Sequence, residues 1–244
     1  INLKIKTIKF KVNPKELSLF LETQNPEIMY RDLLVPVTSI KVYVDFLSLF
    51  KSDLIIKKIR LVSEELDMIQ ISKLSSIIKP SNFKNLLNNK IKEGKLISEI
   101  EIFLNEEGLI NDFIAKGTVR NLKVELLNNM NFKETNLSFF ADKNDILIKN
   151  IFGFLEDIKI SDGDIKLNLE NGIKLNSNFD TKINFDKQVT KKYTKFFKKY
   201  DAVKGLKTFK ADLNNNFSIE LDHTYKVKDY NYSVVGKLEK SKFE

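Results

Sequence analysis

An alternation of polar and apolar residues between Asp164 and Asp186 constrains the fold more than any other part of the sequence. This period of two is typical of a β-strand that has one apolar face and one solvated face. The dipeptide Asn171-Gly172 interrupts the alternation, and Asp162-Gly163 precedes it. Both dipeptides favour the positive φ angles of tight hairpin turns. The stretch therefore predicts a meander that runs strand, turn, strand, turn, strand, with antiparallel neighbours.

The stretch Ile173–Phe185 is predicted to form a single strand of unusual length. Its 13 residues span roughly 43 Å at about 3.3 Å each, whereas strands of globular proteins have about 3 to 10 residues. A sheet built from such strands carries a long apolar face, which must be covered. The cover could be a second sheet, helices, the sheet's own curled edge or an apolar ligand, and the sequence leaves these alternatives open.

Strand patterns extend over most of the chain. Alternating residues recur in Ile40–Phe46 and Ile100–Leu104, Leu54–Leu61 is a further predicted strand, and no proline follows residue 80 to interrupt a strand ladder. Short helices are expected only near residues 72–93, with Gly94 at their end. We therefore predict a mainly β fold, in which a long, curled antiparallel sheet forms a groove (a β-taco) with a few short flanking helices.

Residues 187–204 are predicted to form an amphipathic helix. Its apolar residues recur at helical spacing and lysines largely fill the positions between them; the apolar set is Val189, Tyr193, Phe196, Phe197 and Tyr200. Such a helix can lie on an anionic membrane, and the alternative, which we favour, is a helix packed over the open end of the sheet. The predicted domains are thus a β-groove over residues 1–186, this helix, and a continuation of the sheet over residues 205–244.

Composition argues against several classes of function. The formal charge of +8 accompanies a general excess of Lys, Asn, Ile and Phe; because all four have AT-rich codons, we interpret the charge as codon bias and expect no nucleic-acid partner. The chain has no cysteine and its one histidine is His223, which leaves no residues for a zinc site of the usual kind. Its glycines are scattered and form no phosphate-binding loop. We expect no enzyme activity, no catalytic residue, no metal and no cofactor.

Residues 37–74 combine features that point to a known family. A strand, Ile40-Lys-Val42-Tyr-Val44, leads into the apolar turn Leu47–Phe50 and a second strand, Leu54–Leu61. Strand pairs beginning with glycine follow at Gly117–Leu126 and Gly163–Phe185. This arrangement resembles the AsmA-like proteins of Gram-negative bacteria, the bridge-like lipid transfer family that includes TamB and YhdP.

The resemblance implies an elongated sheet, open along one side, whose concave face is apolar. It implies that phospholipid acyl chains slide along this groove between the inner and outer membranes, in support of outer-membrane biogenesis, while the head groups stay in water. It also implies a periplasmic location and an inner-membrane anchor in a segment that the chain does not contain. The membranes would be reached through parts outside this fragment.

Two hypotheses follow, and the alternation fits both. In the first, the chain is a lipid-conducting groove lined by apolar residues of the alternating strands: Ile100, Ile102, Leu104, Ile165, Leu167, Leu169, Ile173, Leu175, Phe179, Ile183 and Phe185. In the second, it is a structural or protein-interaction β-sandwich domain of a secreted or surface protein, whose apolar faces pack on each other. A sandwich needs no ligand, whereas an open groove leaves room for hydrocarbon.

Overall fold

The computed structural model describes residues 2–13, 18–30, 33–46, 48, 54–71, 90–125, 130–170, 172–194, 206–224, 226–239 and 241–243. Before residue 90 the strands are β1 (Asn2–Lys4), β2 (Lys9–Asn13), β3 (Ser18–Gln24), β4 (Glu27–Tyr30), β5 (Leu33–Val44), β6 (Ile56–Ser63) and β7 (Leu66–Asp67). After it come β8 (Ile91–Leu104), β9 (Ile110–Glu125), β10 (Asn131–Ala141), β11 (Asp145–Leu155), β12 (Ile158–Asn168), β13 (Ile173–Phe185), α3 (Lys187–Thr194), β14 (Leu206–Leu221), β15 (Val227–Leu238) and β16 (Lys242–Phe243).

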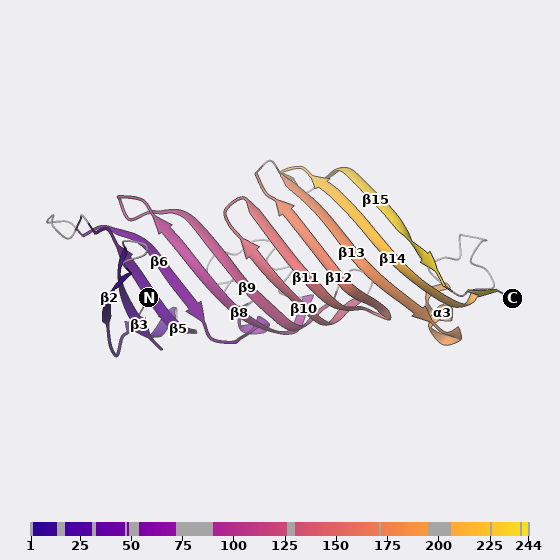
Figure 1. Ribbon diagram of the computed structural model, residues 1–244, viewed down its shortest axis with the longest axis horizontal. Coiled ribbons are helices and arrows are strands. Elements are labelled where there is room, and N and C mark those ends of the chain that lie inside the picture. The colour runs from indigo at the N-terminus through magenta and orange to yellow at the C-terminus, as the bar shows by residue number, and fades with distance from the viewer. Residues whose placement is uncertain are drawn as a thin grey trace. The chain divides into compact units, whose positions relative to one another are not determined.

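These strands pair as an antiparallel sheet (Figure 1). Hydrogen-bonded neighbours follow the order β1-β4-β5-β6-β8-β9-β10-β11-β12-β13-β14-β15, and the path does not close, because among the described strands β1 pairs with β4 alone and β15 with β14 alone. The prediction of a mainly β fold with a long antiparallel sheet is confirmed. From β8 to β15 each strand pairs with its neighbour in the sequence, whereas β1 pairs with β4, β3 with β5 and β6 with β8.

Contacts within the chain divide it into two compact units. Unit 1 comprises residues 1–89, 93–119 and 139–144, and unit 2 comprises residues 90–92, 120–138 and 145–244. The division that the sequence suggests, with breaks at residues 187 and 205, follows secondary structure rather than contacts and stays a prediction.

In unit 1, cross-strand register separates an apolar face from a charged one. The apolar side chains Leu19, Ile40 and Val44 are buried. On the other face, Glu22 pairs with Lys11 and Lys41, and Arg60 donates a hydrogen bond of 2.6 Å to Glu99. Opposite charges across neighbouring strands stabilise a sheet without needing a second layer on that face.

Unit 2 contains the strands on which the sequence analysis rests. β13 runs from Ile173 to Phe185, so the prediction of one long strand is confirmed. Gly172, with a φ of 104°, lies between β12 and β13 where a turn was expected. On the polar face, the amide of Asn178 donates hydrogen bonds to Asn214 (3.2 Å) and Asn216 (2.6 Å) of β14. Asparagine side chains thus join neighbouring strands on the solvated side of the sheet.

The expectation of a turn at Asp162-Gly163 was wrong. Both residues lie inside β12, and the register with β13 shifts between Ile160 and Asp162. The turn before β12 is formed instead by residues 156–157, where Glu156 has a φ of 54°. The glycine serves close packing: a Cβ on Gly163 would lie 2.5 Å from a ring carbon of Phe179, its partner on β13. The Phe179 ring therefore occupies the space that a side chain at residue 163 would need.

The helix predictions are only partly testable. Residues 72–89 lie outside the described residues, whereas Ile91 and Gly94 belong to β8, so the expectation that a helix continues to Gly94 was wrong. The helix expected from residue 187 is present as α3, Lys187–Thr194. Residues 195–204, with Phe196, Phe197 and Tyr200, lie outside the described residues.

Adding a methyl group at residue 163 should destabilise unit 2. We expect Gly163→Ala to lower the free energy of unfolding by about 1–3 kcal/mol, because overpacking forces side chains away from their preferred rotamers. Lys166→Ala, on the same strand but exposed on the other face, should change it by less than about 0.5 kcal/mol. Urea unfolding measures both values. In the Gly163→Ala/Phe179→Leu double variant the loss should be less than additive, and additive losses would contradict this account of the glycine.

Candidate functional site: the apolar face of strands β11 to β15

The register of unit 2 places one side of five strands together, because directly opposed residues of an antiparallel pair share a face. We call this side the apolar face. Its apolar members are Ile146, Ile148 and Leu155 on β11, Ile158, Ile160, Ile165 and Leu167 on β12, Ile173, Leu175, Phe179, Ile183 and Phe185 on β13, Phe209, Ala211, Leu213, Phe217, Ile219 and Leu221 on β14, and Val227, Tyr230, Tyr232, Val234 and Leu238 on β15.

Most of the residues predicted to line a groove lie on the apolar face: Ile165, Leu167, Ile173, Leu175, Phe179, Ile183 and Phe185. Leu169 follows the last residue of β12 and is 38% exposed. The other three predicted residues lie on β8 in unit 1, where Ile100 pairs with Leu61 and Ile102 with Ile59. The eleven residues predicted to line a single groove therefore lie in two different units, and a groove common to both units stays a prediction.

Little of the described chain covers the apolar face. Its strands pack against their neighbours in the sheet and, in the case of β13 and β14, against α3. Ile160, Phe185 and Ala211 are buried, but Leu167, Leu175 and Phe179 remain partly exposed. Among the described residues of unit 2 there is accordingly no second sheet over this face. An apolar surface of this extent normally meets a partner or a ligand.

A hollow of about 340 Å³ lies on the apolar face. We call it the apolar hollow, and it is lined by Phe132, Leu155, Ile158, Ile160, Phe179, Thr181, Ile183, Leu213, Asn215 and Tyr232. Its volume is at the lower end of the range of about 300–1,000 Å³ that small-molecule sites occupy. The walls come from strands β10 to β15, so the register of these strands determines its shape.

The polar side chains of the apolar hollow pair with one another or with the backbone. The hydroxyl group of Tyr232 donates to Asn215 Oδ1 (3.1 Å), and the Asn215 amide donates to Thr181 Oγ1 (2.9 Å) and to the Phe179 carbonyl (3.1 Å). The Thr181 hydroxyl donates to the Leu213 carbonyl (3.4 Å). Because these groups already have hydrogen-bond partners, the hollow presents mainly hydrocarbon to a ligand.

Helix α3 packs at one end of the apolar face. Asp186 is the N-cap of the helix, since its carboxylate accepts hydrogen bonds from the backbone N–H groups of Gln188 (2.8 Å) and Val189 (2.9 Å). The Tyr193 ring stacks on Phe185, with ring centroids 4.6 Å apart and 6° between the planes. Of the two alternatives for this helix, we favoured packing on the sheet, and the contact with Phe185 agrees with it. Contact with a membrane stays untested.

An acidic turn holds α3 in place. Lys192 binds both Glu156 (3.1 Å) and Asp157 (2.9 Å) in the turn between β11 and β12. Burial by itself would raise the pKa of Glu156, but hydrogen bonds from Asn131 and Lys192 and the charge of Lys133 outweigh it and lower the pKa to about 2. The pKa of Lys192 is raised by its hydrogen bonds to Asp157 and Glu156. The turn therefore acts as an ionised clamp on the helix at neutral pH.

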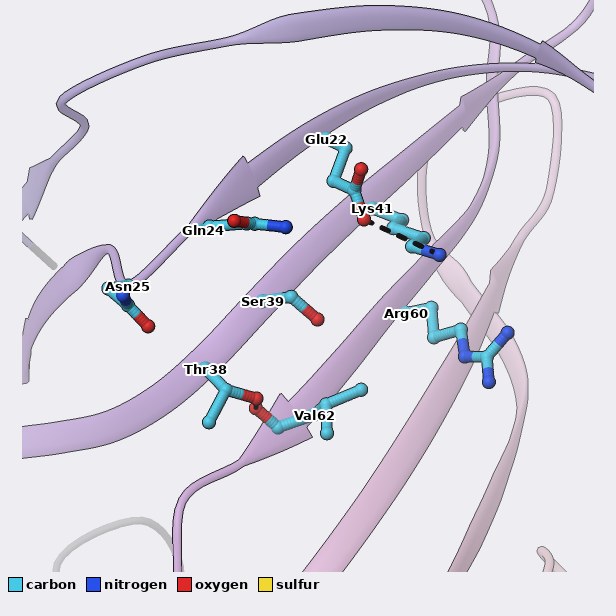
Figure 2. A pocket seen from close by; sticks show the side chains of 8 residues that line it. All are labelled: Glu22, Gln24, Asn25, Thr38, Ser39, Lys41, Arg60 and Val62. Atoms are coloured by element: carbon cyan, nitrogen blue, oxygen red, sulfur yellow. Dashed lines mark hydrogen bonds and ion pairs between the residues drawn. The ribbon is translucent and has the colours of Figure 1, made fainter.

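A second hollow, in unit 1, differs in character. It has a volume of about 370 Å³ and is lined by Glu22, Gln24, Asn25, Thr38, Ser39, Lys41, Arg60 and Val62 (Figure 2). Figure 2 shows Lys41 reaching Glu22, at 3.5 Å. Nearly every lining side chain is polar and the charged ones are ion-paired, so this polar hollow does not suit an apolar ligand.

The sequence analysis missed several residues of the apolar hollow. Thr181 was not selected because it is polar, and Asn215 and Tyr232 were not selected because the predicted groove contained no residue after Phe185, although each shares the apolar side of its strand. Alternation would have placed Thr181 on that side, since it lies midway between Phe179 and Ile183. No sequence signal places Phe132 beside β13, because that needs the arrangement of the strands from β10 onward.

Comparisons with known proteins found no match among family models, curated proteins or solved structures. None of the helices in the described ranges is long and apolar enough to cross a lipid bilayer. His223 lies exposed in the turn after β14. The candidate site therefore rests on its own geometry.

The clamp on α3 should depend on pH. Because the pKa of Glu156 lies below its ordinary value of 4.5, its contribution to stability is complete above about pH 4.5 and is lost as the pH falls toward 2. We expect Glu156→Gln to be less stable than the unmodified chain by about 1–3 kcal/mol at pH 7, with the difference vanishing near pH 2. Urea unfolding across this pH range measures it. The exposed Glu134→Gln serves as control, and a difference that does not change with pH would contradict the clamp.

Proposed function

We propose that the apolar face of unit 2 binds the acyl chains of phospholipids and lets them move along the strands. The observation that carries the proposal is a wide apolar surface over which the described part of the unit places only α3. The apolar hollow supports it, because its polar groups are paired internally and its remaining wall is hydrocarbon. A flexible hydrocarbon chain is the kind of ligand that such a wall accepts.

The energetics favour a ligand of this kind without selecting its head group. Removing apolar surface from water contributes roughly 25 cal/mol per Å², or about 0.8 kcal/mol for each buried methylene. A strand of 13 residues spans roughly 43 Å, which exceeds the thickness of about 30 Å of a bilayer's hydrocarbon core. The apolar face therefore has the length to hold an acyl chain at successive positions, and similar affinity along its length permits movement.

In this proposal the chain is a segment of an AsmA-like protein in the periplasm, moving phospholipid between the inner and outer membranes and acting without catalysis. The sequence resemblance over residues 37–74, in unit 1, and in the glycine-led strand pairs supports this placement. One of those pairs begins at Gly163, and its strands β12 and β13 form the centre of the apolar face. The proposed lipid surface and part of the resemblance therefore share these two strands.

Lipid binding should be measured directly on the purified chain. We expect phospholipid to copurify with it, as detected by mass spectrometry of an organic extract, and to be taken up from vesicles of phosphatidylethanolamine and phosphatidylglycerol. Finding no phospholipid by either route would contradict the proposed function.

Leu167→Asp should separate lipid binding from folding. Leu167 is partly exposed on the apolar face, so a carboxylate there should destabilise the fold by only about 1 kcal/mol while lowering bound phospholipid at least several-fold. The matched control is Lys166→Asp, which places the same charge on the opposite face of the same strand. If the apolar face instead packs against another protein layer, Leu167→Asp buries an unpaired charge and costs about 3–5 kcal/mol. Unfolding of that variant would favour the sandwich interpretation.

A further inference from the structure

The polar hollow of unit 1 lies where a ladder of cross-strand charges loses its alternation. One row of directly opposed residues crosses β2, β3, β5, β6 and β8, and its members in order are Lys9, Glu22, Lys41, Arg60 and Glu101. The signs alternate along this row except at Lys41 and Arg60, where two cations lie directly opposite each other. Like charges in this position destabilise the pairing of two strands. The register of β5 and β6 therefore concentrates positive charge at one place on the charged face.

The polar hollow, of about 370 Å³, includes both cations in its lining (Figure 2). The next row of the same face consists of Gln24, Ser39 and Val62, which are uncharged and also line the hollow. Among the described residues the hydroxyl group of Ser39 has no hydrogen-bond partner. The hollow thus combines two opposed cations with a neutral hydrogen-bond donor.

The carboxylates around the hollow do not balance its cations. Among the described residues the ion-pair network has five cations and three carboxylates: Lys11, Lys41, Lys58, Arg60 and Lys116, with Glu22, Glu99 and Glu101. Glu22 is shared between Lys11 and Lys41, so it does not offset both. One terminal nitrogen of Arg60 donates to Glu99, while its buried Nε has no hydrogen-bond partner among the described residues. The guanidinium group therefore keeps donors that the protein does not satisfy.

We propose that the polar hollow binds a phosphate group between Lys41 and Arg60. A bound anion replaces the repulsion of the two cations by two attractions. The planar guanidinium group matches the oxygens of a phosphate, and the lysine ammonium group binds it as a point charge. A phosphate has a further oxygen for the Ser39 hydroxyl, whereas a carboxylate has only two oxygens in all. Inorganic phosphate and a phospholipid head group offer the same chemistry. The site lies in unit 1 and does not require that the apolar face of unit 2 bind lipid.

Calorimetric titration of the whole chain with inorganic phosphate, at constant ionic strength, tests the site. We expect saturable binding, which Lys41→Gln and Arg60→Gln should each weaken about tenfold or more, because each removes a hydrogen bond to a charged group. The matched control is Lys58→Gln, which removes a cation from the same strand and the same network but does not line the hollow. It should weaken binding far less. Circular dichroism checks that each variant is folded, and Ser39→Ala, which changes no charge, should also weaken binding.

Two results would overturn the proposal. One is the absence of saturable phosphate binding by the unmodified chain, and the other is a loss in Lys58→Gln as large as that in Lys41→Gln, which would show only a general effect of charge. Leu167→Asp, in unit 2, should leave phosphate binding unchanged, so this proposal and that of the lipid surface fail separately.

Vesicles separate the two sources of the phosphate group. If the hollow holds a lipid head group, cosedimentation with phosphatidylglycerol vesicles should fall in both Lys41→Gln and Arg60→Gln, and free glycerol phosphate should compete with the vesicles. If it holds a free phosphate, neither substitution should change cosedimentation, while the calorimetric loss remains. Each result supports a phosphate site and assigns its ligand.

Discussion

Cross-strand register is the constraint on which the other features of unit 2 depend. The pairing of β12, β13 and β14 opposes Leu167 to Leu175 and Leu175 to Ile219, so each strand adds its apolar residues to the same side. A shift of one residue would send every apolar side chain of a strand into the solvated face. The hydrogen-bonded ladder thus does two things at once: it satisfies the backbone and it assembles the apolar face.

Small deviations from regular pairing shape that face. The pairing of β12 with β13 shifts register between Ile160 and Asp162, next to Gly163, and the Phe179 ring lies over this glycine. A similar pair occurs in unit 1, where a Cβ on Gly117 would lie 2.8 Å from a ring carbon of Phe139. In both hairpins a phenylalanine on the second strand lies against a glycine on the first, and at Gly117 the backbone oxygen of Ile97 lies closer still. Aromatic cover of a glycine is a known device for fixing the register of a sheet.

Alternation predicted strand β13, but the connections of the strands were predicted only in part: the turn at Gly172 is present, and the one at Asp162-Gly163 is not. Ile173–Phe185 matches β13 at both ends, because all its apolar residues lie at odd-numbered positions and its even-numbered positions are polar. Asp162-Gly163 has the composition of a turn, yet Phe179 uses the glycine for packing, and a contact between strands is invisible to local sequence. The apolar hollow was predicted only in part, because Thr181, Asn215 and Tyr232 contribute by pairing with one another across strands.

A sheet covered on one side by so little protein has a distinct thermodynamic character. The heat-capacity change of unfolding follows the apolar area that a fold removes from water, and it is about 12–15 cal/mol/K per residue for ordinary globular domains. The partly exposed residues Leu167, Leu175 and Phe179 already contact water in the folded chain, so they add less to this quantity than residues of a two-layer core. The stability curve of such a fold is therefore flatter than that of a two-layer domain of the same length.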